Sequence, residues 1–239
     1  EAFDACPSDG TETTVEVLRN CTTDMANIIE ENKNIVLDIQ SYKIVSGIEN
    51  LFTNNGKFKI VDSIGNGRII SAKEKKKKNE ETGNFAINNI TMQMTGSSAI
   101  DETIENKGML EVTGGVIISD GLKNKCINNI EQGTVKITGG TVSAYTYAIY
   151  NTSSNKIEIE GGTVQATYYY EGYSAIYNNT ENGVVEIKGG LVTNQGKAIE
   201  NKKGTIKVTG GEIRTTQGDT RYSECGIYNN GKVIIEDVK

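Results

Sequence analysis

Two kinds of side chain in this sequence could do chemistry: a pair of glutamates in a repeated pattern and a concentration of tyrosines. Glu158 and Glu186 each stand between two aliphatic residues. If these segments stack as neighbouring parallel strands, the two carboxylates lie about 4.8 Å apart, close to the roughly 5 Å separation of a retaining glycosidase pair. Lys136 and Lys207 hold the same position in the flanking copies. A ladder of charges on a solvated face therefore also explains the pair, and we favour it.

Ten of the eleven tyrosines lie between Tyr145 and Tyr228, mostly in variable segments between repeated phrases. Equivalent loops of a stacked-repeat protein project from one edge, so these rings are expected to gather on one side. A tyrosine offers a flat apolar face and a polar tip, which suits a sugar ring or a protein partner. The alternative is that long loops fold back and use tyrosine to pack over the sheet. The binding candidates are Tyr145, Tyr147, Tyr168, Tyr169, Tyr170, Tyr173, Glu171, Asp219, Arg221 and Tyr222, with Glu224 in the same loops.

The sequence lacks the residues that several other kinds of site require. The chain has no histidine, and its four cysteines show no C-x-x-C spacing, so neither a zinc site nor a catalytic triad is expected. The glycine pairs recur in every copy and none is expected to open a helix, which excludes a phosphate-binding loop. We therefore expect no metal and no cofactor.

Charge and hydropathy limit the classes of binding partner that are expected. The net charge of -6 argues against sequence-independent binding of nucleic-acid phosphates by the chain as a whole. The basic run at residues 73–78 is interpreted as a solvated loop. No stretch approaches the roughly 20 apolar residues of a membrane helix, so no membrane insertion is expected within this segment.

The cysteines leave one question open. Cys6 and Cys21 are close enough in sequence for a disulfide, and the sequence does not decide whether they are bonded. Cys126 and Cys225 are separated by several repeats, too far to bridge, and are expected to be free thiols.

The organising feature is a repeated phrase, G-x-V-x-I-x-G-G. Its alternation of apolar and polar residues predicts a strand with one buried face. The closing Gly-Gly allows a sharp bend, and an aliphatic residue two positions later begins a second strand. Copies begin at Gly108, Gly133, Asn155, Gly183 and Gly204.

A second phrase, [A/C/G]-I-x-N, separates successive copies of the first. Its asparagines are expected to form a ladder of side-chain amides along the stack. The copies are residues 126–129, 148–151, 175–178, 198–201 and 226–229, with earlier relatives at 47–50 and 86–89.

These periods, roughly 21 to 28 residues long and without a helical pattern, predict an all-β, single-stranded, right-handed parallel β-helix. Residues 1–40 are expected to form an N-terminal cap, with a partly helical stretch from Thr22 to Asn34, and residues 41–239 the rungs. The C-terminal end shows no evident cap, so the chain is expected to be excised from a longer protein.

Residues 34–69, together with the repeated phrases that follow, resemble the pectate-lyase-like β-helix regions of large surface proteins from low-GC Gram-positive and related bacteria. The resemblance implies an extracellular or wall-attached, adhesin-like protein. Lyases of this type hold calcium with clustered aspartates and use a lysine or arginine base. Here the expected strands carry almost no aspartate, and the chain has only four arginines.

The function predicted from the sequence is a non-enzymatic adhesin-like module, secreted or on the cell surface. It would bind carbohydrate or a host protein through the loops at residues 145–173 and 215–224. The first alternative is a polysaccharide lyase or glycosidase acting in a groove beside Glu158 and Glu186. The second is a passive stalk.

Overall fold

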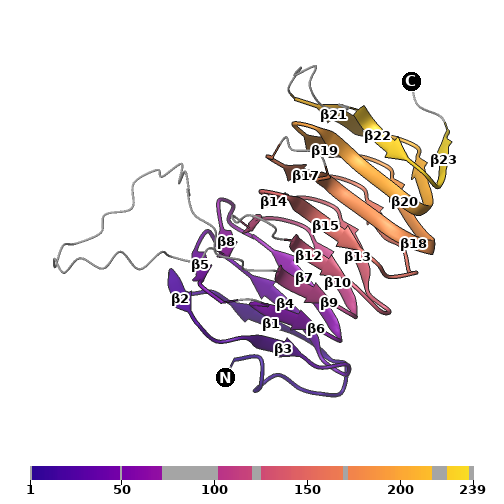
Figure 1. Ribbon diagram of the computed structural model, residues 1–239. Coiled ribbons are helices and arrows are strands. Elements are labelled where there is room, and N and C mark those ends of the chain that lie inside the picture. Colours follow the sequence, from indigo (N-terminus) through magenta and orange to yellow (C-terminus); the bar gives the residue numbers. More distant parts are fainter. Residues whose placement is uncertain are drawn as a thin grey trace.

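The chain folds as an all-β parallel solenoid (Figure 1). The computed structural model describes residues 2–48, 50–71, 102–119, 125–168, 172–216 and 225–236, and none of these residues is helical. Every strand pairing is parallel, and the first strands β1–β3 lie at the opposite end of the stack from β21–β23. The predicted parallel β-solenoid is confirmed.

Each turn contributes three strands, which stack into three columns. The first column is β1 (Glu12–Glu16), β4 (Asn34–Asp38), β7 (Lys57–Val61), β10 (Met109–Val112), β13 (Thr134–Ile137), β16 (Ile157–Ile159), the later halves of β18 (Ser174–Ile187) and β20 (Lys197–Val208), and β23 (Lys232–Ile235). The second is β2 (Cys21–Thr23), β5 (Lys43–Ser46), β8 (Arg68–Ser71), β11 (Val116–Ser119), β14 (Thr141–Ala144), β17 (Thr163–Ala166), β19 (Leu191–Asn194) and β21 (Glu212–Thr215). The third is β3 (Asn27–Ile29), β6 (Phe52–Asn54), β9 (Glu102–Asn106), β12 (Lys125–Asn129), β15 (Tyr147–Asn151), the earlier halves of β18 and β20, and β22 (Cys225–Asn229).

A single hydrophobic core, made mostly of aliphatic side chains, fills the interior. Ile149, Ile176 and Ile199 are register partners in the third column, and all three are fully buried. Successive side chains of a strand point to opposite faces, so the alternating phrase places its aliphatic residues inward. Full burial of such a side chain contributes about 1.5–3 kcal/mol, which makes stacking of the rungs the main source of stability.

The glycine pairs are required where the first column bends into the second. Gly140 has a φ of 75°, a region that L-residues other than glycine rarely adopt. A Cβ on its neighbour Gly139 would lie 2.5 Å from the backbone oxygen of Thr113 in the preceding rung. The bend therefore tolerates no side chain at either position.

The predicted asparagine ladder is present in the third column, and all its members except the last, Asn229, are buried. The Nδ2 atom of each asparagine donates to the Oδ1 atom of the next, over distances of 2.6–2.8 Å. The members are Asn54, Asn106, Asn129, Asn151, Asn178, Asn201 and Asn229.

The sequence pattern predicted the earliest copies of the second phrase at the wrong residues. Asn54, not Asn50, enters the ladder, and the Thr103 to Asn106 copy was missed. The phrase at residues 86–89 lies outside the described residues. The strands on either side of that segment pair directly, β6 with β9, β7 with β10 and β8 with β11.

The predicted helical stretch between Thr22 and Asn34 is wrong, because β2 and β3 occupy it. These strands pair with β5 and β6, so non-local pairing prevails over the local polar composition. Stacking thus begins at β1, within the segment assigned to a cap, and the domain division at residue 40 stays a prediction. The Phe3 ring contacts Phe52 and Phe58 at this end of the core.

All four cysteines are free thiols in this structure, so the disulfide considered between Cys6 and Cys21 is not formed. Cys6 is buried, and its Sγ donates to the backbone oxygen of Ala2 over 3.3 Å. Cys126 is fully buried, and burial raises the pKa of its thiol to about 12, which makes it a packing residue.

Candidate binding surface

The third column presents a row of outward side chains opposite the asparagine ladder. In four successive rungs the register partners are Tyr150, Tyr177, Glu200 and Tyr228. Each stands between an inward isoleucine and a ladder asparagine, so strand alternation directs it away from the core. The fold therefore fixes this row at the rung spacing of about 4.8 Å.

Six tyrosines form one continuous ring network, which we call the tyrosine surface. The Tyr150 and Tyr177 rings stack, with centroids 4.7 Å apart and planes 12° apart. The Tyr147 ring meets both of them edge-on, at 5.4 and 5.6 Å. The network then runs from Tyr147 to Tyr173 at 5.3 Å, from Tyr173 to Tyr168 at 5.6 Å, and from Tyr168 to Tyr145 at 4.5 Å.

The structure brings four of the predicted tyrosines together: Tyr145, Tyr147, Tyr168 and Tyr173. Tyr150 and Tyr177 were not among the binding candidates, and Tyr147 joins their rings to those of the loop tyrosines. The role of these residues in binding stays a prediction. The remaining candidates, Tyr169, Tyr170, Glu171, Asp219, Arg221, Tyr222 and Glu224, lie outside the described residues.

Cations and hydrogen bonds fix the rings further. The Lys125 ammonium lies 4.5 Å from the centroid of the Tyr150 ring, and that of Lys197 lies 4.4 Å from the Tyr228 centroid. The Tyr147 Oη atom donates to the backbone oxygen of Gly172 over 2.6 Å. Burial, and secondly the negative charge of Glu200, raise the pKa of the Tyr147 phenol, which therefore stays neutral.

Glu200 interrupts the row of tyrosines and was not singled out in the sequence. It is only 1% exposed, whereas the next partner, Tyr228, is 36% exposed. Its Oε1 atom lies 2.7 Å from the Lys202 ammonium and 3.5 Å from that of Lys197. The available signal was a glutamate at the x position of A-I-x-N, where the flanking copies have tyrosine.

The first column carries the predicted charge ladder on its outer face. Lys136, Glu158, Glu186 and Lys207 are successive register partners, so the two glutamates are neighbours as expected. The Lys156 ammonium pairs with Glu158 at 2.7 Å and also with Glu186.

This ladder holds both glutamates as carboxylates. Hydrogen bonds from Lys156 and then Lys188 lower the pKa of Glu158 to about 2, and Lys156 lowers the pKa of Glu186. A glycosidase acid instead needs a raised pKa. The ion pairs therefore suit a structural ladder better than an acid and nucleophile pair.

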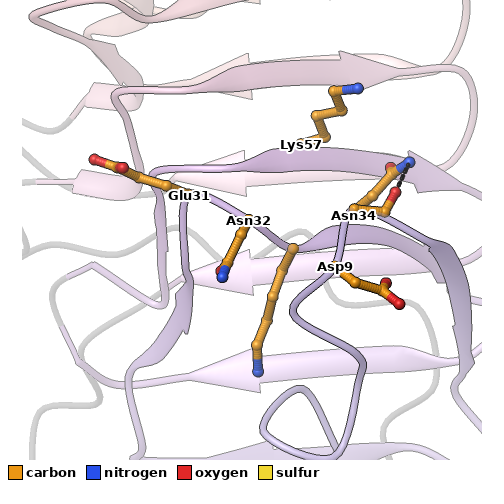
Figure 2. A pocket seen from close by; sticks show the side chains of 7 residues that line it. Asp9, Glu31, Asn32, Asn34 and Lys57 are labelled. Atoms are coloured by element: carbon orange, nitrogen blue, oxygen red, sulfur yellow. Dashed lines mark hydrogen bonds between the residues drawn. The ribbon is translucent and has the colours of Figure 1, made fainter.

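A cavity of about 320 Å³ lies near the N-terminal end and is shown in Figure 2. Its charged side chains Asp9, Glu31 and Lys57 point in different directions and do not converge (Figure 2). The Lys33 ammonium donates to the backbone oxygen of Phe3 over 2.7 Å. These contacts tie down the N-terminal segment and form no reactive constellation.

Within the described ranges, no group of three or more potential metal ligands occurs. The same residues contain no helix that is long and apolar enough to cross a membrane.

Comparison of the chain with protein-family models, with curated proteins and with solved structures gives no match.

Proposed function

We propose that this chain is a non-enzymatic, adhesin-like β-solenoid module that binds carbohydrate through the tyrosine surface. The continuous network of six half-buried rings, mounted on adjacent rungs, is the observation that supports it. The proposal includes a right-handed coil of the pectate-lyase-like kind and a location outside the cell, on the surface or secreted. The resemblance of residues 34–69 and of the repeats supports these last points.

The rings suit sugars for two physical reasons. Several ring faces are already covered by stacking, so the outer edges of the rings pack against the apolar C–H face of a pyranose, and the tyrosine hydroxyl groups exchange hydrogen bonds with the sugar. The rings of Tyr150 and Tyr177 start from neighbouring rungs of a rigid sheet, so little conformational entropy is lost when a ligand binds. A linear glycan running along the solenoid axis would meet one ring after another.

The test is a glycan array probed with the wild type and with the double variant Tyr168→Ala, Tyr173→Ala. We expect the wild type to retain a set of glycans and the variant to lose at least tenfold in apparent affinity, because the edge of the ring network is removed. Tyr42→Ala is the matched control, since Tyr42 precedes β5 and lies outside the network, and it should bind as the wild type does.

Two results would count against the proposal. If the wild type retains no glycan, the module does not bind carbohydrate. It then binds a host protein, or it binds no ligand. If the double variant and the wild type bind alike, the tyrosine surface is not the site.

A polysaccharide lyase or glycosidase is the second candidate, and the register pairing of Glu158 with Glu186 is the observation that favours it. This candidate predicts that the wild type releases reducing ends from a polysaccharide and that Glu186→Gln abolishes the release. Because both glutamates are held in ion pairs, we expect no release by either protein in a reducing-sugar assay over a polysaccharide panel. Turnover that Glu186→Gln removes would establish the enzyme instead.

A further inference from the structure

One buried acid lies in the row of outward tyrosines of the third column. Glu200 is the register partner of Tyr177 on one side and of Tyr228 on the other. Its side chain is 2% exposed. Burying a carboxylate is costly unless both oxygens gain partners, so a glutamate at this position needs an explanation.

The two oxygens of Glu200 differ in what they contact. Oε1 faces the ammonium groups of Lys202, at 2.7 Å, and Lys197, at 3.5 Å. Oε2 is buried and has no hydrogen-bond partner. A carboxylate in an ion pair only accepts hydrogen bonds, so Oε2 requires a donor from outside the described protein groups.

The surroundings of Glu200 are aromatic and cationic. The Lys197 and Lys202 ammonium groups lie 4.4 and 5.5 Å from the centroid of the Tyr228 ring.

The connection that enters the rung of Glu200 from the second column is short, since β19 ends at Asn194 and β20 begins at Lys197. In the preceding rung the equivalent connection runs from Ala166 to Ser174 and carries Tyr168 and Tyr173.

We propose that Glu200 is the residue that reads a hydroxyl group of a sugar bound to the tyrosine surface. A neutral pyranose packs its C–H face against the outer edges of the stacked Tyr150 and Tyr177 rings, and one of its hydroxyl groups donates a hydrogen bond to Oε2 of Glu200. Lys197, whose side chain is 13% exposed, holds Oε1 in place. Lys202 is 38% exposed and moves aside to admit the sugar.

This inference rests on the carbohydrate-binding function proposed above and deepens it, because it names the group on the ligand that is recognised. A site that hydrogen-bonds a hydroxyl through a buried acceptor rejects an analogue without that hydroxyl, since the acceptor is then left unpaired. Discrimination against one deoxy sugar is therefore the signature of Glu200, and ring stacking alone would not produce it.

The experiment uses titration calorimetry of the 239-residue chain with four neutral probes: the β-1,4-linked tetrasaccharides of glucose, xylose, mannose and N-acetylglucosamine. The probe that binds most tightly is then replaced by its monodeoxy analogues. We expect the wild type to bind one of these analogues at least tenfold more weakly than the parent, as expected for a lost hydrogen bond to a charged group.

Two variants test the residue. Glu200→Met keeps the length of the side chain and removes both acceptors, so it should bind parent and analogue with equal affinity. Glu200→Gln is the milder change and should weaken the discrimination, because a neutral amide replaces a charged acceptor. Glu105→Gln is the matched control: Glu105 holds the same outward position in β9, pairs with Lys107 at 3.4 Å and lies outside the tyrosine surface.

The outcomes separate the two proposals. If Glu200→Met binds as tightly as the wild type and still rejects the same analogue, the role of Glu200 is overturned while carbohydrate binding stands. If the wild type binds none of the four probes, both proposals are overturned for neutral sugars. Urea midpoints of all variants show whether they fold. If Glu200→Met does not fold, the discrimination shown by Glu200→Gln tests the role of Glu200.

Discussion

Each buried asparagine of the ladder uses its side chain in two directions. The Oδ1 atom of Asn151 accepts from Asn129 over 2.8 Å, and its Nδ2 atom donates to Asn178 over 2.7 Å. An aspartate at this place would lack the donor, and a leucine would lack both groups. The amide therefore fixes the register of one rung on the next, which aliphatic packing alone leaves less specific.

Replacement of Asn151 by alanine should lower the free energy of unfolding by about 2–4 kcal/mol, because it leaves buried groups of Asn129 and Asn178 with fewer partners. The control is Asn229→Ala in the exposed last rung, with an expected cost below about 1 kcal/mol. Urea unfolding followed by circular dichroism measures both. Equal losses for the two variants would show that the ladder contributes nothing specific.

At the scale of elements, the outer face of the first column is a network of ion pairs spanning several strands. The Lys188 ammonium lies 2.7 Å from Glu158 in the preceding rung and 3.3 Å from Glu160. The Lys207 ammonium lies 3.7 Å from Glu186. Isolated surface pairs contribute little, but shared cations in a network give several strands a common dependence on pH.

Acid should therefore weaken the stack. The pKa values of Glu158, Glu160 and Glu186 are lowered by their lysine partners, for Glu158 to about 2. A lowered pKa in the folded state means that this stabilisation is complete above pH about 4.5 and is lost as the pH falls towards 2. We expect the urea midpoint to fall between pH 6 and pH 3.

The matched comparison for this pH effect is Glu158→Gln, which should show a smaller fall over the same range because one of the three carboxylates is absent. Added salt at 1 M should also reduce the fall in the wild type by screening the pairs. If the midpoint is independent of pH in all samples, the ladder is not coupled to folding.

At the scale of the whole molecule, repetition is what made the fold predictable. Five near-identical copies of G-x-V-x-I-x-G-G state the strand, the bend and the inward residues, and the structure confirms them from β10 onward. The first rungs depart from the pattern. β6 reads Phe52-Thr53-Asn54, with phenylalanine where the later copies have isoleucine. The residues at 47–50 match the second phrase better, so the pattern predicted Asn50 instead of Asn54 as the ladder asparagine.

The candidate site was predictable only in part. The clustering of Tyr145, Tyr147, Tyr168 and Tyr173 follows from their place in equivalent connections. The burial of Glu200 does not, because it depends on side chains of neighbouring rungs and on two lysines in its own strand. Ring contacts across rungs, such as that of Tyr147 with Tyr177, likewise depend on side-chain conformations that the repeat pattern does not specify.

The asparagine ladder has a direction, because every Nδ2 donates towards the C-terminal neighbour. At its starting end the Oδ1 atom of Asn54 is buried without a hydrogen-bond partner in the part of the chain that the structure describes. Amide groups aligned in this way add their dipoles, with the oxygen end at Asn54 and the hydrogen end at Asn229. A protein whose described residues include no helix thus carries a permanent electrical axis along its length.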